Sequence, residues 1–214
     1  MNSIRKHTVF AGVLSVVFGM GMYSFLPSIA NAQGTAPAEN LVRFSSPTMG
    51  PADAKVHIVE FLDPACETCR SFYPFVKRMM AANPGRIRVS IRYAPFHKNA
   101  DQVVKVLEAT RRQGKYWEAL EALLKSQARW SPNHTPQPDL VWIELEGLGL
   151  DLDRVRQDMN APDIARNIQQ DIADARALDV DKTPEFFVNG KPMPSFGFEQ
   201  LTTLVIDALA KAYP

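Results

Sequence analysis

The sequence VHIVEFLDPACETCR, residues 56–70, decides the fold because it joins an apolar run to a turn that carries two cysteines. Residues 56–62 are mostly apolar on both alternating faces, which predicts a central β-strand covered on each side. Cys66 and Cys69 follow at C-x-x-C spacing and are the only two cysteines among the 214 residues. A chain of this length buries enough apolar surface without a disulfide. We therefore interpret the pair as redox chemistry rather than as a structural staple.

The N-terminal residues have the composition of an export signal. Arg5 and Lys6 precede an uncharged run at residues 9–26, and Ala-Asn-Ala at residues 30–32 fits a signal-peptidase site. We predict a cleavable signal peptide at residues 1–32 and a periplasmic location for the rest. An uncleaved membrane anchor is the alternative, since the apolar run approaches the length that spans a bilayer.

The composition and charge of the chain limit its partners. The chain is 46% hydrophobic and 22% charged, as expected of a compact globular domain. Loss of residues 1–32 changes the formal net charge from +1 to −1. Near-neutrality without a basic block argues against nucleic acid as a partner.

Residues 33–53 are rich in Ala, Pro, Ser and Gly, which predicts a flexible lead-in. This segment leaves no room for a dimerisation domain and favours a monomer.

After the cysteines the hydrophobic pattern alternates between helix and strand. A helical stripe over residues 66–82 precedes an alternating strand at residues 86–93, which has arginines and a serine on one wetter face. Residues 94–178 contain no convincing strand and have helical periodicity instead. The helices predicted there are residues 100–112, 115–129, 139–146, 152–159 and 162–178.

Sheet structure resumes near the C-terminus. Residues 184–188 predict a strand, and Asn189-Gly190 is a strong signal for a two-residue hairpin turn. A helix over residues 198–212 then closes a single domain, which we place at residues 54–214.

Three parts of the chain resemble the DsbA-like thiol–disulfide oxidoreductases, in that family's order and spacing. EFLDPACETC at residues 60–69 resembles the active-site entry. PFHKNA at residues 95–100 and GKYW at residues 114–117 resemble the start of the family's helical insertion. TPEFFVNG at residues 183–190 resembles its cis-proline strand and hairpin. The likeness extends from about residue 54 to residue 212.

This resemblance implies an α/β fold of the thioredoxin type. A helical subdomain at about residues 97–178 is then inserted between the βαβ half and the C-terminal ββα half. One departure concerns Glu67-Thr68, which is neither the Pro-His of strongly oxidising DsbA nor the Gly-Pro of thioredoxin. The redox poise is therefore left open. Thr183 before the proline is closer to the disulfide isomerases of the superfamily.

The position of the cysteines predicts their roles. Exchange requires a thiolate, and a free thiol with a pKa of about 8.5 is only partly ionised at neutral pH. The N–H groups and dipole at a helix N-terminus favour the Cys66 anion, whereas Cys69 lies one turn further along. We predict Cys66 as the nucleophile and Cys69 as the resolving thiol. The Glu67 carboxylate disfavours the Cys66 anion, and Glu67 and Thr68 are expected to tune the site.

The resemblance implies further site residues. The Thr183–Pro184 bond is expected to be cis and to face the cysteines, where the backbone can bind a substrate peptide; an ordinary trans proline is the alternative. Glu60 corresponds by position to the family's buried acid and is expected to relay the Cys69 proton. A surface acid at a strand end is the alternative. His97 is a weaker candidate for the border of the site, and a loop or capping role is favoured for it.

The sequence thus predicts an exported enzyme that exchanges disulfides with protein substrates, with no cofactor and no metal. An oxidase requires a quinone-linked membrane partner, whereas a reductase or isomerase requires electrons from a membrane reductase. The sequence does not decide the direction of electron flow. The alternative function is a periplasmic copper-binding module, because Cys66, Cys69 and methionine thioethers are soft ligands. A fixed, non-catalytic disulfide is a third possibility.

Overall fold

The computed structural model describes the backbone of residues 38–214 and the side chains from residue 40 onward. The predicted signal peptide at residues 1–32 lies outside the described residues, as does the first part of the predicted lead-in. Within the described part, no helix is long and apolar enough to cross a membrane.

The sheet has the strands that the sequence predicts, with one addition. Their bounds are β1 Thr48–Met49, β2 Val56–Leu62, β3 Ile87–Tyr93, β4 Glu185–Val188 and β5 Lys191–Pro192. The order across the sheet is β1-β3-β2-β4-β5. β2 and β3 are parallel, with Val56 opposite Ile87 and Leu62 opposite Tyr93. β4 is antiparallel to β2 and continues through the predicted hairpin into β5. β2 is therefore the central strand, as its two apolar faces indicate.

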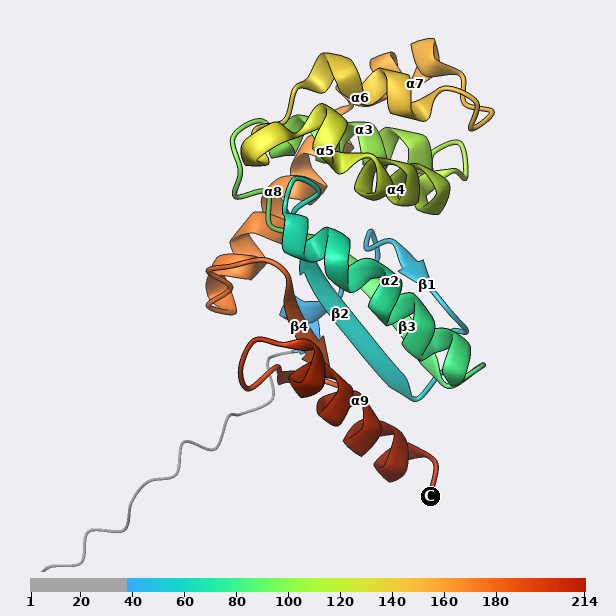
Figure 1. The fold of residues 1–214 in the computed structure, drawn as a ribbon, viewed down its shortest axis with the longest axis vertical. Coiled ribbons are helices and arrows are strands. Elements are labelled where there is room, and N and C mark those ends of the chain that lie inside the picture. The colour runs from blue at the N-terminus through green and yellow to red at the C-terminus, as the bar shows by residue number, and fades with distance from the viewer. Residues whose placement is uncertain (1–37) are drawn as a thin grey trace, which may run out of the picture. The chain divides into compact units, whose positions relative to one another are not determined.

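Helices cover both faces of this sheet. Their bounds are α1 Ala38–Leu41, α2 Glu67–Ala82, α3 Ala100–Arg111, α4 Tyr116–Lys125, α5 Gln127–Trp130, α6 Pro138–Leu145, α7 Leu152–Asp158, α8 Pro162–Ala177 and α9 Phe198–Ala212. Ile58 and Leu62 face a core cluster that includes α2 and α9, whereas Val59 and Phe61 face a second cluster with α1 and α8. Figure 1 shows α2 crossing the sheet and α3 to α7 stacked beyond its first turn.

The inserted helices differ from the prediction in one respect. Residues 115–129 were expected to form one helix, but α4 ends at Lys125 and α5 begins at Gln127. Ser126 lies at the break, where its hydroxyl donates to the Ala122 carbonyl at 2.8 Å. A short 3-10 turn, η1 Pro132–His134, follows α5. The break turns Gln127 toward the cysteine-bearing turn.

The described part of the lead-in corrects the expectation of a flexible segment at residues 33–53. α1 contacts α8, and β1 pairs antiparallel with β3, with Thr48 opposite Ser90. The guanidinium of Arg92, 0% exposed, holds this segment by donating to the Asn40 and Leu41 carbonyls, each at 2.8 Å. Buried backbone carbonyls need donors, and here the donor comes from a strand more than fifty residues away in sequence.

Candidate active site

The two cysteines lie at the start of α2, and both are free thiols. Cys66 is the N-cap residue and is 7% exposed, whereas Cys69, one turn further along, is 0% exposed. Cys66 is therefore the more exposed of the two cysteines, as the sequence predicts. Because Cys66 precedes the helix, its sulfur meets backbone N–H groups that have no partner within the helix.

The surroundings of Cys66 favour its anion. The pKa of Cys66 is lowered to about 5, and the largest cause is a hydrogen bond from the Cys69 thiol. Burial acts in the opposite direction and raises this pKa. The Thr183 side chain and the N–H groups of Cys69 and Thr68 lower it further. When protonated, the Cys66 thiol donates to the Thr183 carbonyl at 3.2 Å. That carbonyl favours the thiol and the hydroxyl of the same residue favours the thiolate, so Thr183 contacts the sulfur in either state.

Cys69 has the opposite character. Burial raises the pKa of Cys69 well above its ordinary value, and the neighbouring Cys66 and Glu60 raise it further. A buried thiol with anionic neighbours keeps its proton. At neutral pH the pair therefore holds one thiolate, on the sulfur with some exposure, and one thiol, on the sulfur with none.

The second predicted element of the site lies directly against Cys66. The Thr183–Pro184 peptide bond is cis, as expected. Pro184 is buried, and Thr183, half-buried, contacts the Cys66 sulfur through its carbonyl. β4 begins at the next residue and pairs with β2, which ends just before the cysteine turn. Adjacent strands therefore bring two segments 117 residues apart in sequence into contact.

Glu60 lies in the interior and not at a surface strand end. It is 1% exposed and points from β2 into the same cluster as Ile58 and Leu62. Its Oε1 has no hydrogen-bond partner within the part of the chain described here. Burial, and secondarily the Cys66 charge, raises the pKa of Glu60 to about 8. A carboxyl with this pKa exchanges protons near neutral pH.

The cysteine turn itself is held by Asp63, which sequence reasoning missed. The buried Asp63 carboxylate accepts from the Ala65 N–H at 2.8 Å, the His97 N–H at 2.9 Å and the His97 ring Nδ1–H at 2.8 Å. An Asp that binds the N–H two residues on is a known turn former, so the local sequence carried part of this signal. His97 thus contacts the turn through the Asp63 carboxylate, and its ring stacks on that of His134.

Gln127 is the second residue that the sequence did not indicate. Its side-chain amide, from α5 of the insertion, donates to the Pro64 carbonyl at 2.8 Å and to the Cys66 carbonyl at 3.0 Å. Gln127 is buried, and within the described residues its Oε1 has no partner. The helical insertion therefore holds the backbone of Cys66 directly.

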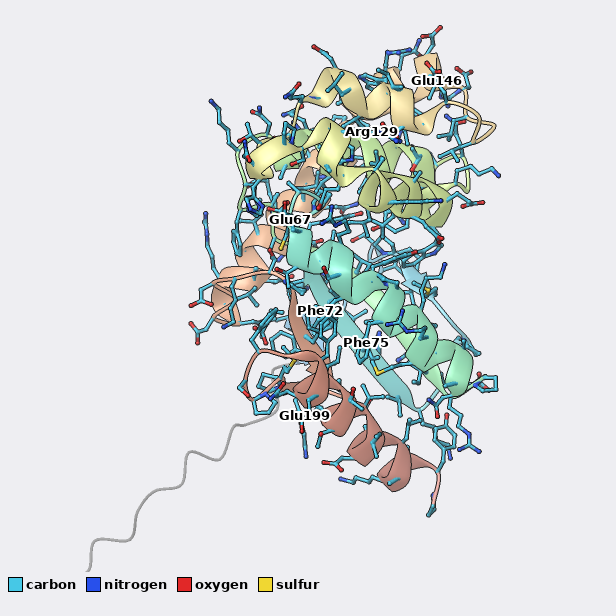
Figure 2. All side chains as sticks on the ribbon, in the orientation of Figure 1. Glu67, Phe72, Phe75, Arg129, Glu146 and Glu199 are labelled. Carbon is cyan, nitrogen blue, oxygen red and sulfur yellow. The ribbon has the colours of Figure 1, made fainter. Side chains whose placement is uncertain are left out.

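The remaining candidates lie around this centre. Figure 2 labels Glu67 at the first turn of α2, where its side chain is exposed, with Phe72 and Phe75 further along the helix. Thr68 is half-buried and contributes its N–H to Cys66. In residues 38–214 no three His, Cys, Asp or Glu side chains are grouped so as to hold a metal ion. The methionines considered as copper ligands pack against or within the core; they are Met49, Met79, Met80 and Met193.

Comparison with known proteins places this geometry in a family. A thioredoxin family model matches residues 44–207. The chain is 28% identical over 159 residues to an Na⁺/H⁺ antiporter NhaA of Herminiimonas arsenicoxydans, covering 74% of this chain and 25% of that protein. It is 26% identical over 190 residues to a probable disulfide bond formation protein D of Bacillus cereus, covering 85% and 86%. The chain spans about a quarter of the length of the antiporters that it matches.

A solved structure agrees with the fold. A thioredoxin-like oxidoreductase from Silicibacter pomeroyi is 27% identical, has a TM-score of 0.70, and is covered over 99% of its length by 83% of this chain. The sheet with helices on both faces is thus that of a thioredoxin fold, and further helices are inserted between β3 and β4. The family model covers most of the chain and includes every residue of the cysteine site. The chain belongs to the thioredoxin family, with the DsbA-like arrangement of an inserted helical subdomain.

Proposed function

We propose that the chain is a thiol–disulfide oxidoreductase that acts on protein substrates through Cys66 and Cys69. The observation that carries the proposal is the contrast between the two sulfurs. The Cys66 sulfur has a lowered pKa and lies against the cis-proline strand, and the Cys69 sulfur keeps its proton in the core. A structural disulfide requires no such asymmetry, whereas two-step exchange does.

The first step is attack by the Cys66 thiolate on a substrate disulfide. The new bond joins Cys66 to one substrate sulfur, the substrate S–S bond breaks, and the second substrate sulfur leaves as a thiolate. The Thr183 carbonyl and hydroxyl border the reacting sulfur. A substrate backbone lying along this segment is aligned for the reaction without a proline N–H to compete.

The second step requires the Cys69 thiol to lose its proton, and Glu60 is the acceptor that we assign. The Cys66 charge contributes to the raised pKa of Glu60. This charge disappears when Cys66 enters the mixed disulfide, so the pKa of Glu60 falls and Glu60 releases its own proton to solvent. The Glu60 carboxylate then accepts the Cys69 proton. Cys69 then attacks Cys66, the protein disulfide forms, and the bound substrate sulfur leaves reduced. Substrate oxidation is the same sequence in reverse.

The wider setting is also part of the proposal. Export through a signal at residues 1–32 would place the site in the periplasm, where disulfides persist. Return of the cysteines to their starting state requires a membrane partner, either a quinone-linked oxidase or a reductase.

Exposed Phe196 and Phe198 join Phe72 and Phe186 in one aromatic group beside α2 and the cis-proline strand. This surface suits apolar segments of incompletely folded substrates. We propose a monomer.

Trapping in the producing cell tests the proposal. The Cys69→Ser variant lacks the resolving thiol, so we expect it to accumulate mixed disulfides with substrate proteins that dithiothreitol releases. The Cys66→Ser variant and the double variant should trap none. Reduction of insulin by the purified protein gives an independent rate. Trapping by Cys66→Ser in place of Cys69→Ser would reverse the two roles, and absence of both trapping and insulin reduction would refute the function.

A further inference from the structure

A groove between α2 and α4 lies outside the thiol site and carries excess positive charge. Its cavity is about 390 Å³, within the range of about 300–1,000 Å³ that ligand sites occupy. Tyr73 and Leu124 contribute apolar surface to its lining. The charged lining consists of four cations and one carboxylate: Arg70, Lys77, Arg78, Lys125 and Glu121. Figure 1 shows the two helices beside each other, with α4 next to the first half of α2.

Most of this charge is not neutralised within the protein. Lys77 binds Glu121 at 2.5 Å. Arg70, Arg78 and Lys125 form no ion pair with any carboxylate among the described side chains. The whole chain has a formal net charge of only +1. Three uncompensated cations in one groove are therefore a local excess, complementary to an anionic partner.

The lining of the groove starts at Arg70, one helical turn along α2 from Cys66. Cys66, Arg70 and Lys77 are spaced by four and seven residues, so they share one side of α2. With a rise of about 1.5 Å per residue, Arg70 and Arg78 lie roughly 6 and 18 Å along the axis from Cys66. An extended peptide advances about 3.3 Å per residue. The cations therefore match side chains about two to five positions from a peptide residue bonded to Cys66.

We propose that this groove docks an acidic segment of the protein substrate, two to five residues from the cysteine that reacts with Cys66. The inference rests on the proposed exchange activity and adds a substrate class to it. The apolar surface of Tyr73 and Leu124 accommodates the intervening side chains, while Arg78 and Lys125 bind the carboxylates. Acidic residues beyond this distance are expected to have little effect.

The test uses the full chain carrying Cys69→Ser, with synthetic peptides whose single cysteine is linked to thionitrobenzoate. The Cys66 thiolate attacks the peptide sulfur, the peptide–thionitrobenzoate bond breaks, and coloured thionitrobenzoate leaves as the anion. Three peptides carry glutamates two to five residues from the cysteine, glutamates eight or more residues away, or lysines at the near positions. Each design is made on both sides of the cysteine.

We expect the near-acidic peptide, on one side of the cysteine, to react roughly 10-fold faster than the near-basic one at low ionic strength. Exposed ion pairs are individually weak but together raise association rates. The preference should shrink as salt shortens the screening length to about 10 Å at 0.1 M. The double substitution Arg78→Glu and Lys125→Glu should abolish or invert it. Arg166→Glu with Arg176→Glu changes the net charge equally on exposed α8 positions and should leave the preference intact.

Several results would overturn the inference. Equal rates for near-acidic and near-basic peptides would do so, because they would show no charge preference. Equal effects of the two double substitutions would also do so, because they would indicate the field of the whole molecule. Dimerisation that only the groove substitutions abolish would assign the groove to a second copy of the chain. If no peptide reacts, the exchange activity itself fails. Fluorescence anisotropy with serine in place of the peptide cysteine then decides the groove separately, and loss of acidic preference there refutes it.

Discussion

At the scale of single residues, the reactivity of Cys66 depends on groups that the sequence around it does not display. Glu67 is its neighbour and was expected to oppose ionisation, yet the thiolate is favoured by Cys69, by the Thr183 side chain and by two backbone N–H groups. The resulting pKa of about 5 lies between the values of about 3.5 for DsbA and about 7 for thioredoxin. A thiolate of intermediate stability predicts a disulfide less oxidising than that of DsbA.

This pKa predicts the pH dependence of alkylation. The rate of Cys66 modification by iodoacetamide, measured on reduced protein, should rise with pH through a midpoint near 5 and then remain level to pH 8. Thr183→Val removes the hydroxyl and should move the midpoint upward. The Cys66→Ser variant should show no modification in this range, because Cys69 stays protonated. A wild-type midpoint above 8 would contradict the assignment of the thiolate.

Gln127 provides a prediction about backbone positioning. Gln127→Glu replaces the amide donor by a carboxylate facing the carbonyls of Pro64 and Cys66. We expect the alkylation midpoint of Cys66 to rise and the exchange rate to fall, because a negative charge disfavours the thiolate. Gln127→Leu should cost about 1–3 kcal/mol by leaving buried acceptors without their donor. Gln169→Glu, an exposed change on α8, is the matched control, and an equal response would contradict this role.

At the scale of elements, the sequence predicted those whose signal is local. The two apolar faces of β2, the stripe of α2 and the Asn-Gly hairpin each gave correct elements. The sequence-based predictions failed where contacts between residues distant in sequence determine which side chains are buried. Alternation in β3 predicted a wetter face, but Ser90 and Arg92 on that face are both buried. α1, β1 and α8 cover them, and the Ala- and Pro-rich composition of the lead-in gave no sign of that docking.

The buried guanidinium of Arg92 yields a stability prediction. It binds Asp171 at 2.8 Å and Asp174 at 2.5 Å in addition to the lead-in carbonyls. Arg92→Met leaves these carboxylates and carbonyls short of a donor and should lower the free energy of unfolding by about 3–5 kcal/mol, measured by urea denaturation. Arg88→Met, four residues earlier on the same strand face, should cost much less. An equal loss of unfolding free energy in the two variants would mean that the hydrogen bonds and ion pairs of Arg92 add no stability beyond that of an ordinary arginine on this face.

At the scale of the whole molecule, the site also affects how stability depends on pH. In the reduced protein, the folded state holds no Cys66 proton above pH 5, whereas the unfolded thiol keeps its proton to about pH 9, so this group makes stability rise with pH. Glu60 does the reverse between about pH 4.5 and 8, because its folded state keeps the proton that the unfolded state loses. The two effects oppose each other between pH 5 and 8.

Single substitutions should separate these opposing effects. Relative to wild type, reduced Glu60→Gln should gain stability as pH rises from 5.5 to 7.5, and reduced Cys66→Ser should lose it. The slope should be at most about 1.4 kcal/mol per pH unit, and smaller for Cys66, whose partial exposure allows solvent screening. Denaturation at several pH values measures both. If the stability of both variants changed with pH in the same direction relative to wild type, the opposite effects assigned to Glu60 and Cys66 would be contradicted.

The anchoring of the Cys66 peptide unit has one more consequence. Its N–H donates to Asp63, and its carbonyl accepts from both Arg70 and Gln127. With the main chain clamped on either side, the covalent partner of the sulfur can change by rotation about a single side-chain bond. The exchange that we propose therefore requires no rearrangement of the surrounding backbone, because the Cys66 sulfur can turn from the substrate sulfur to Cys69 while its own main chain stays in place.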